Sequence, residues 1–495
     1  MGLMRFVVNP TSRMTQERAV RAYLSGHDRV PWTSRSSWNG ELVVIERPVD
    51  DSGNFHIPWE VEGYGELMLG TATLRERPKP YNLHVELARG KLNQVRNQIA
   101  EWQAIGLAVP DRLAHRLKEG LELFASAATT QNDLDISSKH AEQALIAALD
   151  SANLLTACYA DQALAARHRQ DPQLTTLLGA NLGHTLLDDF TARQYLMTFN
   201  SAIVPLNWRE VEANEGNYDW SVYDKQVEWC QKNRLVACGG PLLLLDQRGF
   251  PDWLCLWEGD FPSLMSFVSD YVETCVTRYQ GKIQIWECAA RANVGSVLSL
   301  TEEQRLRLTV RALETTRQVD PDAQCLISID QPWAEYMVKG EWDLSPIHFA
   351  DALARADLGL AGVNLEINLG YYPGGTPARD QLEFSRLVDL WSYLGLPLYL
   401  TLTFPTSENP DPKALRQTSP KAGGMPGGWS TAAQRTWIER FIPLILSKRA
   451  VYGIMFNQLS DAQPHDFPHG GLFGAEGRPK PALATLAALR KYHLK

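Results

Sequence analysis

The sequence has few cysteines, and none of them stands in a paired motif. The seven Cys residues are an odd number and show no CxxC spacing, and several lie inside apolar segments. We therefore interpret them as buried thiols in a reducing compartment. Apolar runs of about 18 residues, the length of a membrane span, are also missing. The first residues lack the apolar core of a signal peptide, so we expect a cytoplasmic protein without membrane contact.

A surplus of basic residues is absent as well. The 48 Lys and Arg residues are outnumbered by 57 Asp and Glu residues, which gives a net charge of −9. Nucleic acids and anionic membranes need a basic footprint, so this balance argues against both as partners. No G-x-S-x-G, Walker or G-x-G-x-x-G motif is present, and we expect no cofactor. Neutral substrates remain open.

Three regions differ in their residue pattern. Residues 1–82 contain short apolar or alternating stretches between turn signals, which predict a small β-rich domain. Residues 83–170 carry apolar residues at spacings of three and four, which predict a helical segment. In residues 171–495, short apolar runs alternate with amphipathic segments. Eight such units in about 320 residues predict a (β/α)₈ TIM barrel of the α/β class.

Polar residues follow the predicted barrel strands. Active sites of such barrels lie at the carboxyl ends of the strands, so these residues are expected to share one rim. The rim is rich in amides and carboxylates, which suits a neutral polyhydroxylated ligand. The candidate binding and catalytic residues on it are Asn207, Trp208, Asp246, Arg291, Gln331, Asp330, Glu366, Asn368, Asn457 and Asp461.

Five separated stretches resemble motifs of glycoside hydrolase family 10, the endo-β-1,4-xylanase barrels. They are "FNSAIVPLNW" with "EGNYDW", then "GFPDWL", "IQIWEC", "GLPLYLTLTF" and "GLFGAEGRPKPAL", in the family's order. The resemblance covers the last 320 residues or so and implies a barrel directed at an oligosaccharide or polysaccharide of the xylan type. It does not cover residues 1–170.

In the same alignment, other residues occupy the positions of the family's two catalytic glutamates. Retaining glycosidases need two carboxyl groups about 5–5.5 Å apart, one as nucleophile and one as acid/base. The family's acid/base Glu falls on Arg291 and its nucleophile Glu on Leu402. Leucine cannot attack an anomeric carbon, and a guanidinium does not give up its proton at neutral pH. The second-strand Glu and Lys of the family are missing too.

Two interpretations of this loss stay open. In the first, catalysis has moved to Glu366 and Asp330, which replace neutral family residues on neighbouring strands. Two close carboxyl groups in a dry cleft would supply one acid and one base. In the second, the barrel is a pseudoenzyme that binds or scaffolds a glycan, with Trp333 and Tyr371 available for stacking. Arg291 would then pair with the carboxylates.

Three weaker patterns complete the analysis. The stretch "DAQPHDFPHGG" has the look of a metal loop, but incidental polar residues are the favoured interpretation, and His465 is a candidate substrate contact. Four N-terminal aromatic residues (Trp32, Trp38, Trp59 and Tyr64) form either a sugar-stacking platform, as in a carbohydrate-binding module, or simple packing, which we favour. The Pro- and Gly-rich segment 407–429 is a candidate flap.

Overall fold

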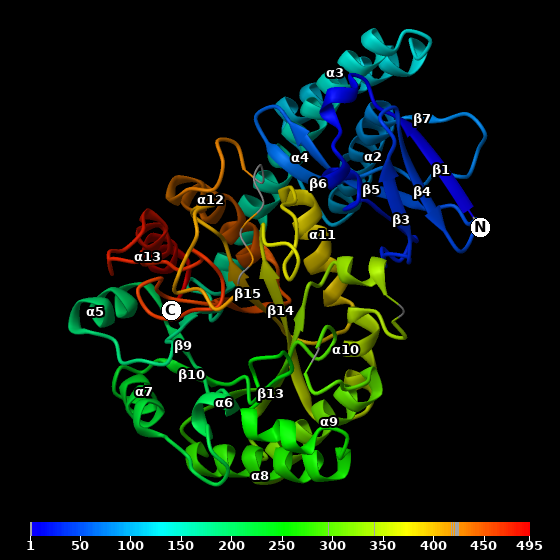
Figure 1. The fold of residues 1–495 in the computed structure, drawn as a ribbon. Coiled ribbons are helices and arrows are strands. Elements are labelled where there is room, and N and C mark those ends of the chain that lie inside the picture. The colour runs from blue at the N-terminus through cyan, green and yellow to red at the C-terminus, as the bar shows by residue number, and fades with distance from the viewer. Residues whose placement is uncertain (1, 296, 341, 417, 419, 421–424) are drawn as a thin grey trace.

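Parallel strands close into a barrel in the C-terminal two thirds of the chain (Figure 1). The computed structural model describes residues 2–295, 297–340, 342–416, 418, 420 and 425–495. Within these residues the sheet has the order β10-β9-β8-β16-β15-β14-β13-β12-β11, and pairing of β10 with β12 closes it. Its strands are β8 (Leu177–Asn181), β9 (Ser201–Val204), β10 (Val236–Gly239), β11 (Leu243–Leu244), β12 (Ile285–Ala290), β13 (Gln324–Asp330), β14 (Leu360–Asn368), β15 (Leu398–Thr403) and β16 (Val451–Phe456).

The short strands β10 and β11 both pair with β12 and together take one position in the barrel. The nine strands of the barrel sheet, as described, therefore make eight positions in the barrel, and each position is followed by a helix on the outside. These helices are α5 (Asp189–Thr198), α7 (Ser221–Lys232), α8 (Phe261–Tyr279), α9 (Glu302–Val319), α10 (Pro346–Arg355), α11 (Gln381–Ser392), α12 (Thr431–Ser447) and α13 (Pro481–His493). The predicted (β/α)₈ barrel is confirmed.

The barrel interior changes from apolar to polar along the strands. Near their amino ends an apolar cluster fills it, formed by Ile203, Cys238, Ile285, Leu326, Tyr399 and Met455. Further along β14, Asn364, Glu366 and Asn368 are buried polar residues. The alternate residues Val363, Leu365 and Ile367 belong to the large apolar core shared with the outer helices. The period of two thus delivers polar side chains to the carboxyl end of the barrel.

Before the barrel, the chain forms two small sheets and three long helices. One sheet has the order β3-β4-β1-β7 and the other the order β2-β5-β6. The helices α2 (Leu83–Ala104), α3 (Asp111–Thr129) and α4 (Leu134–Gln170) follow them. The strands are β1 (Gly2–Val7), β2 (Tyr23–Ser25), β3 (Arg35–Trp38), β4 (Leu42–Arg47), β5 (Asn54–Val61), β6 (Gly65–Gly70) and β7 (Tyr81–Asn82), with the short helix α1 (Gln16–Ala19) between β1 and β2.

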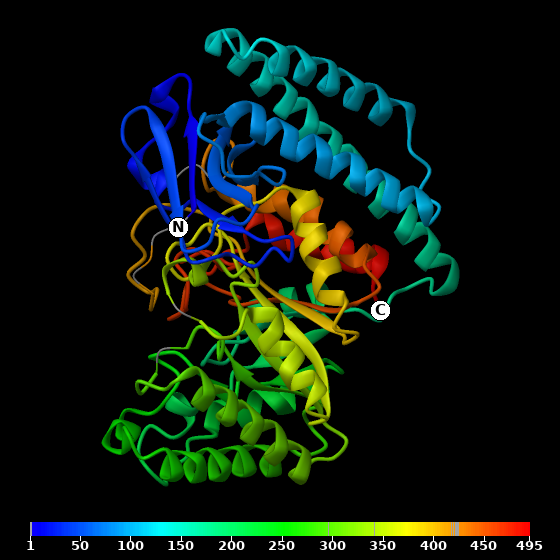
Figure 2. The same cartoon turned by 90° about the vertical axis from the view of Figure 1, so that its right-hand side faces the viewer.

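Strands and helices of this region share cores with each other and with the barrel. One apolar cluster joins Phe6 and Phe55 of the sheets to Leu145 of α4. Another joins Trp102 of α2 and Leu155 of α4 to Leu382 of the barrel helix α11. Figure 2 shows the light-blue α2 lying above the yellow α11. The N-terminal region is therefore packed against one side of the barrel.

The N-terminal aromatic residues do not form an open platform. Trp59 is buried and meets the His84 ring edge to face, with ring centroids 4.9 Å apart. The Tyr64 hydroxyl donates to Asp150 Oδ1 at 2.5 Å. Trp32 and Trp38 are half-buried against the same apolar cluster. This arrangement is packing of the kind that a small sheet makes against helices.

Candidate functional site at the mouth of the barrel

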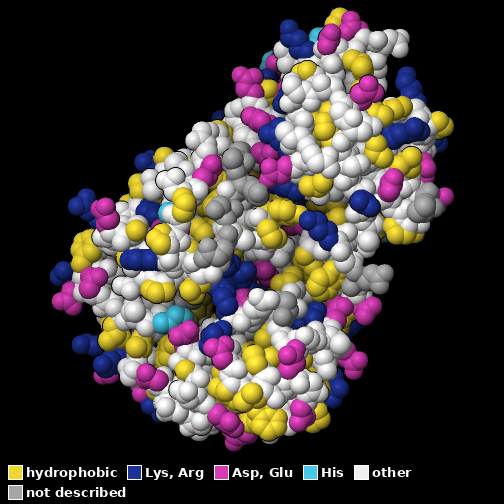
Figure 3. Space-filling view, in the orientation of Figure 1, with side chains coloured by type: hydrophobic (Ala, Val, Ile, Leu, Met, Phe, Trp, Pro, Cys, Tyr) yellow, Lys and Arg dark blue, Asp and Glu magenta, His cyan; other side chains and the backbone are white. Residues whose placement is uncertain are grey.

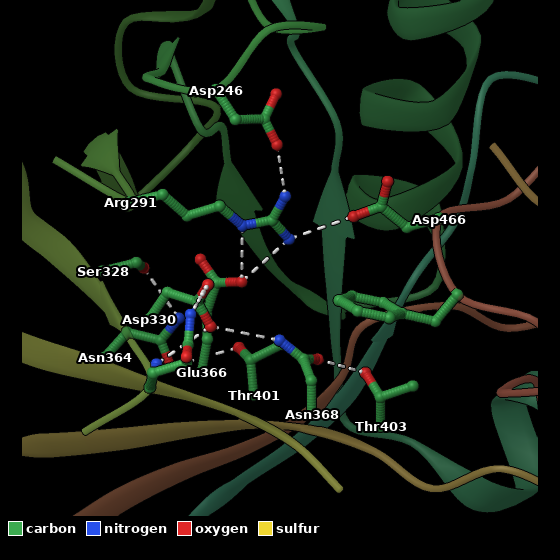
Figure 4. Close-up of polar contacts among 12 residues, drawn as sticks. Asp246, Arg291, Ser328, Asp330, Asn364, Glu366, Asn368, Thr401, Thr403 and Asp466 are labelled. Carbon is green, nitrogen blue, oxygen red and sulfur yellow. Dashed lines mark hydrogen bonds and ion pairs between the residues drawn. The ribbon is translucent and has the colours of Figure 1, made fainter. Parts of the chain in front are cut away.

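Toward the carboxyl end of β15, the side chains that face the barrel interior are threonines. The Thr401 hydroxyl donates to Asn364 Oδ1 at 3.1 Å, and the Thr403 hydroxyl donates to Asn368 Oδ1 at 2.7 Å (Figure 4). Leu402 lies between them and points the other way, into the apolar core between barrel and helices. The alignment of Leu402 with the family nucleophile implied that its side chain faces the barrel interior. The structure instead places this side chain on the opposite face of the strand. A one-residue step in a strand reverses the face.

Arg291 lies directly after β12 and joins three carboxylates. Its Nε donates to Glu366 Oε2 at 2.9 Å, and its Nη1 donates to Asp246 Oδ2 at 2.7 Å. Its Nη2 lies 3.0 Å from Asp466 Oδ2 and 2.9 Å from the same Glu366 oxygen. The backbone has φ 61°, and its N–H donates to the Ser328 carbonyl at 3.0 Å. Figure 4 shows the guanidinium at the centre of this network.

Two further arginines form an outer tier over this group. Arg248 Nη2 donates to Asp466 Oδ1 at 2.5 Å, and Arg416 Nη2 donates to Asp246 Oδ2 at 2.9 Å. Their side chains are 27% and 19% exposed, against 4% for Arg291. The outer tier is thus the part that a ligand can reach. In Figure 3, Lys and Arg side chains gather in a hollow in the middle of the barrel face.

The network fixes the charges of two of its members, Arg291 and Asp466. Burial alone lowers the pKa of Arg291, but the carboxylates of Glu366, Asp466 and Asp246 raise it well above its ordinary value. Burial raises the pKa of Asp466, yet Arg291 and the two outer arginines lower it well below its usual range. Arg291 therefore remains a cation and Asp466 an anion throughout the physiological range.

Three other carboxyl groups at this site have raised pKa values. Burial and the Asp330 charge raise the pKa of Glu366, while Arg291 opposes them. Burial also raises the pKa of Asp330. Beneath them, burial and the nearby Glu366 carboxylate raise the pKa of Glu287 to about 7. Such groups are the usual candidates for proton transfer when a substrate can reach them.

Access to these groups is limited. The side chain of Glu366 is 6% exposed, and residue Asp330 is 2% exposed. Asn368 Nδ2 lies 3.4 Å from Asp330 Oδ1, and the Gln331 backbone N–H donates to the same oxygen at 2.9 Å. Deeper in the barrel, Glu287 accepts a short hydrogen bond from the Ser328 hydroxyl. The acids are thus enclosed by hydrogen-bonding partners of the barrel wall.

Some of the residues predicted for the rim lie elsewhere. Trp208 is buried in the core, where its ring stacks on Tyr271 at 4.8 Å and its Nε1 donates to Glu212 at 2.7 Å. Asn207 caps the short helix α6 (Trp208–Val211) by accepting from the Arg209 backbone N–H. Both residues therefore have local structural partners.

The closing loop also uses its predicted ligand residues internally. Asp461 Oδ2 accepts from Lys480 Nζ at 2.6 Å, and both side chains are buried. His465 Nε2 lies 3.0 Å from Asp411 Oδ2, and its Nδ1 lies 2.7 Å from the Gln463 carbonyl. These contacts tie loop segments together. Among the described residues, no group of three or more His, Cys, Asp and Glu side chains is arranged to hold a metal ion.

The remaining candidates differ in their surroundings. The Asn457 backbone N–H donates to the Leu402 carbonyl at 3.1 Å, and its buried Nδ2 has no hydrogen-bond partner among the described residues. Of the two aromatics, Tyr371 is fully buried, and Trp333 is 9% exposed beneath the Arg379 guanidinium. Residues 417, 419 and 421–424 of the candidate flap lie outside the described residues.

Sequence reasoning missed several members of the site. Arg248 and Arg416 lie on loops, and nothing in their local sequence signals an ion pair. Asp466 was noted only as part of a metal-like loop. Glu287 was identifiable, because it lies in the strand motif "IQIWEC" between Trp286 and Cys288, which face the helices.

Fold and site together define a (β/α)₈ barrel protein with a polar, charge-paired mouth at the carboxyl ends of its strands. The sequence model of glycosyl hydrolase family 10 matches residues 175–327. Endo-1,4-beta-xylanase B of Thermotoga neapolitana is 22% identical over 302 residues, which cover 59% of this chain and 80% of that protein. Endo-1,4-beta-xylanase C of Paenibacillus barcinonensis is 34% identical over 122 residues, or 22% of this chain and 11% of that protein.

Two solved structures also align with this chain. Native xylanase 10B of Thermotoga maritima aligns with a TM-score of 0.49 at 16% identity, covering 66% of this chain and 97% of that one. Xylanase 10B of Thermotoga petrophila RKU-1, in complex with xylobiose, aligns with a TM-score of 0.48 at 17% identity, covering 67% and 97%. On the sequence matches, the barrel of this chain is similar to glycoside hydrolase family 10. The helices of the described residues include none long and apolar enough to cross a membrane.

Proposed function

We propose that the barrel mouth binds a β-linked oligosaccharide of the xylan type and does not cleave it by the two-carboxylate double displacement. The observation that carries the proposal is the contact between Arg291 and Glu366, 2.9 Å from Nε to Oε2. A permanently charged guanidinium stands where the reaction needs a proton donor, and it neutralises the carboxylate closest to it. The names of the relatives, which are xylanases, supply the substrate class.

The chemistry of β15 supports the same proposal. A retaining mechanism needs a second carboxylate about 5–5.5 Å from the first. Strand β15, Leu398–Thr403, contains no Asp or Glu, and its inward side chains toward the carboxyl end are Thr401 and Thr403. A hydroxyl hydrogen-bonded to an amide lacks the neighbouring base that would activate it as a nucleophile. Binding, by contrast, needs donors and acceptors, which the outer arginines and Asp246 and Asp466 supply.

Hydrolysis through Glu366 and Asp330 is a second candidate. The raised pKa values of both groups favour it, because a carboxyl group that keeps its proton to higher pH is a better candidate for a general acid. It also requires substrate to reach groups that are nearly fully buried, which means that Arg291 has to move aside.

We further propose that the protein is cytoplasmic and binds short oligosaccharides in this reducing compartment. All seven cysteines are free, and most of them are buried. Fractionation of cells that produce the protein tests the location. Recovery in the cell-free medium would contradict it.

Two measurements on the purified full chain test the main proposal. Calorimetric titration with xylo-oligosaccharides is expected to show binding that Arg248→Gln weakens by about tenfold, the loss of one charge-assisted hydrogen bond. Arg355→Gln, an exposed arginine on α10, is the matched control and is expected to bind normally. Wild-type protein that binds no oligosaccharide overturns the proposal.

Release of nitrophenol from aryl β-xylosides separates the two candidates. We expect none from the wild type. Release that Glu366→Gln and Asp330→Asn abolish, but exposed Glu476→Gln leaves intact, would establish the second candidate instead. Release that survives both substitutions would rule out both mechanisms.

A further inference from the structure

A cleft outside the barrel mouth lies where the N-terminal region meets the barrel. Its volume is about 320 Å³, at the lower end of the range for small-molecule sites. Strands β5 and β6 supply His56 and Gly70, α2 supplies Lys91 and Gln94, and α11 supplies Arg386. Direct contacts hold these elements together, because Lys91 Nζ donates to Asp380 Oδ2 at 2.7 Å.

From this cleft we propose a second ligand site, which takes a small polyhydroxylated anion such as a sugar acid or a sugar phosphate. The site is separate from the barrel mouth and does not depend on the function proposed for it. Three features of the lining carry the inference: an excess of one cation, a half-buried arginine without an ion pair among the described residues, and a rim of amides and hydroxyls.

Cations outnumber carboxylates in the lining. Four cationic side chains line the cleft, and two carboxylates, Asp380 and Glu383, face them. Both carboxylates are already engaged, Asp380 by Lys91 at 2.7 Å and Glu383 by Arg386 at 3.3 Å. Burial raises the pKa of Glu383, but Arg386, Arg29 and Lys91 lower it to about 2. Arg379 is also paired, with Glu335 at 2.8 Å, so one cation of the lining, Arg29, has no ion-pair partner among the described residues. The four cations are Arg29, Lys91, Arg379 and Arg386.

Arg29 and Arg386 are the two groups least satisfied by the protein. Among the described residues, the single hydrogen bond from the Arg29 side chain goes to the Arg386 backbone carbonyl at 3.3 Å. Burial lowers the pKa of Arg29, and the Arg386 charge lowers it further, against the opposing charges of Glu383, Glu101 and Asp389. A carboxylate or phosphate in the cleft would supply the missing partner of Arg29 and match the bidentate geometry of its guanidinium.

The rest of the cleft suits hydroxyl groups. Its lining includes amide and hydroxyl side chains on both sides, and amides both donate and accept hydrogen bonds. The Trp333 ring lies beneath the Arg379 guanidinium, 4.3 Å from ring centroid to Cζ. Asn93 and Asn97 have no side-chain partner among the described residues, whereas the other four amide and hydroxyl residues already hydrogen-bond within the protein. The amide and hydroxyl residues are Asn54, Thr71, Thr73, Asn93, Gln94 and Asn97.

The loop below the cleft leads directly to the barrel mouth. Pro332 and Trp333 line the cleft, and they follow Asp330 and Gln331, which lie at the end of β13. Gln331 has φ 50°, a left-handed conformation that few side chains adopt. A ligand in the cleft therefore contacts the segment that positions Asp330.

Titration calorimetry on the full chain tests the site with glucuronate, glucose 6-phosphate, glucose and inorganic phosphate. We expect glucuronate or glucose 6-phosphate to bind at least tenfold more tightly than both glucose and phosphate. The preferred one of the two identifies the anion as carboxylate or phosphate. Arg29→Gln and Arg386→Gln should each weaken that binding at least tenfold, and Asn97→Ala should weaken it less.

The control is Arg355→Gln, which removes the same charge from an exposed pair on α10. It is expected to bind like the wild type. Failure of both sugar anions to bind, equal binding of glucose, or binding unchanged in both arginine variants overturns the proposal. If a glutamine variant does not fold, Arg29→Lys and Arg386→Lys replace it, because they keep the charge but lose the bidentate contact.

Discussion

Arg291 Nε lies 2.9 Å from Glu366 Oε2, and both side chains are almost fully buried at the carboxyl end of the barrel. Their strands, β12 and β14, are separated by β13, so the pair spans the inner wall. A buried ion pair of this kind fixes the conformation of the mouth, because either partner alone would be an uncompensated charge. Asp246 and Asp466 extend the same network outward.

The first prediction concerns this pair. Arg291→Met removes the cation and leaves Glu366 buried, which should cost about 3–5 kcal/mol in the free energy of unfolding. Urea denaturation at pH 7 measures it. Adding Glu366→Gln to the Arg291→Met protein should restore part of the loss, since the remaining group no longer ionises. An Arg291→Met protein as stable as the wild type would show that the pair has no structural role.

The second prediction tests the orientation of Leu402. Because its side chain faces the apolar layer beneath the helices, Leu402→Glu should destabilise the protein by about 3 kcal/mol or more and should not create hydrolysis. Leu402→Met is the volume-conserving control, with an expected cost below about 1.5 kcal/mol. A stable Leu402→Glu protein that cleaves aryl β-xylosides would show that residue 402 faces the interior after all.

The sequence was sufficient to predict the barrel but not the side-chain contacts at its mouth. Continuous apolar runs between amphipathic segments identify parallel strands and helices, because each element reports its own burial. The motif alignment likewise brought Arg291 to the mouth. It could not assign the face of Leu402, because a strand alternates at every residue and the structure turns Thr401 and Thr403 inward.

Contacts between distant loops could not be predicted from the sequence, for a different reason. Asp466 and Arg248 meet only because the fold brings together loops that are 218 residues apart. The position of Trp208 after a strand predicts a rim residue. The chain instead enters α6 at this residue, and the ring is buried. Contacts of this kind depend on loop paths, and loop paths leave little periodic pattern in a sequence.

The third prediction uses the titration of Glu287, whose folded-state pKa is about 7 against an ordinary 4.5. Between these values the unfolded chain has lost the proton that the folded protein keeps, so stability falls as pH rises from about 4.5 to 7. The loss from this one group is on the order of 3 kcal/mol. Urea denaturation from pH 4.5 to 8 should show that Glu287→Gln removes this part of the decline.

Comparison with a surface variant isolates the effect, because other groups titrate in the same range. Glu476→Gln is exposed and should follow the wild-type curve. If Glu287→Gln and the wild type change in parallel with pH, then the Glu287 carboxyl group ionises normally in the folded protein.

The fourth prediction separates structure from ligand contact at Asp461. Its Oδ2 lies 2.6 Å from Lys480 Nζ, and its Oδ1 accepts from the Gly471 backbone N–H at 2.7 Å. Asp461→Asn should therefore lower the free energy of unfolding by about 3–5 kcal/mol, and Lys480→Met in the same chain should recover part of it. Folded Asp461→Asn protein is expected to bind xylo-oligosaccharides like the wild type. Normal stability with lost binding would instead make Asp461 a ligand residue.

The last prediction tests whether the N-terminal region and the barrel unfold as one unit. Leu382 of α11 is fully buried in a cluster with Trp102 and Leu155, so Leu382→Ala leaves a cavity at their junction. A cost of about 2–5 kcal/mol is expected, against less than about 0.5 kcal/mol for the exposed Leu256→Ala. Calorimetry should show a single transition that shifts as a whole, because the shared cluster couples the two parts. Two separate transitions, with the barrel one unmoved, would mean that the contact joins independently stable domains.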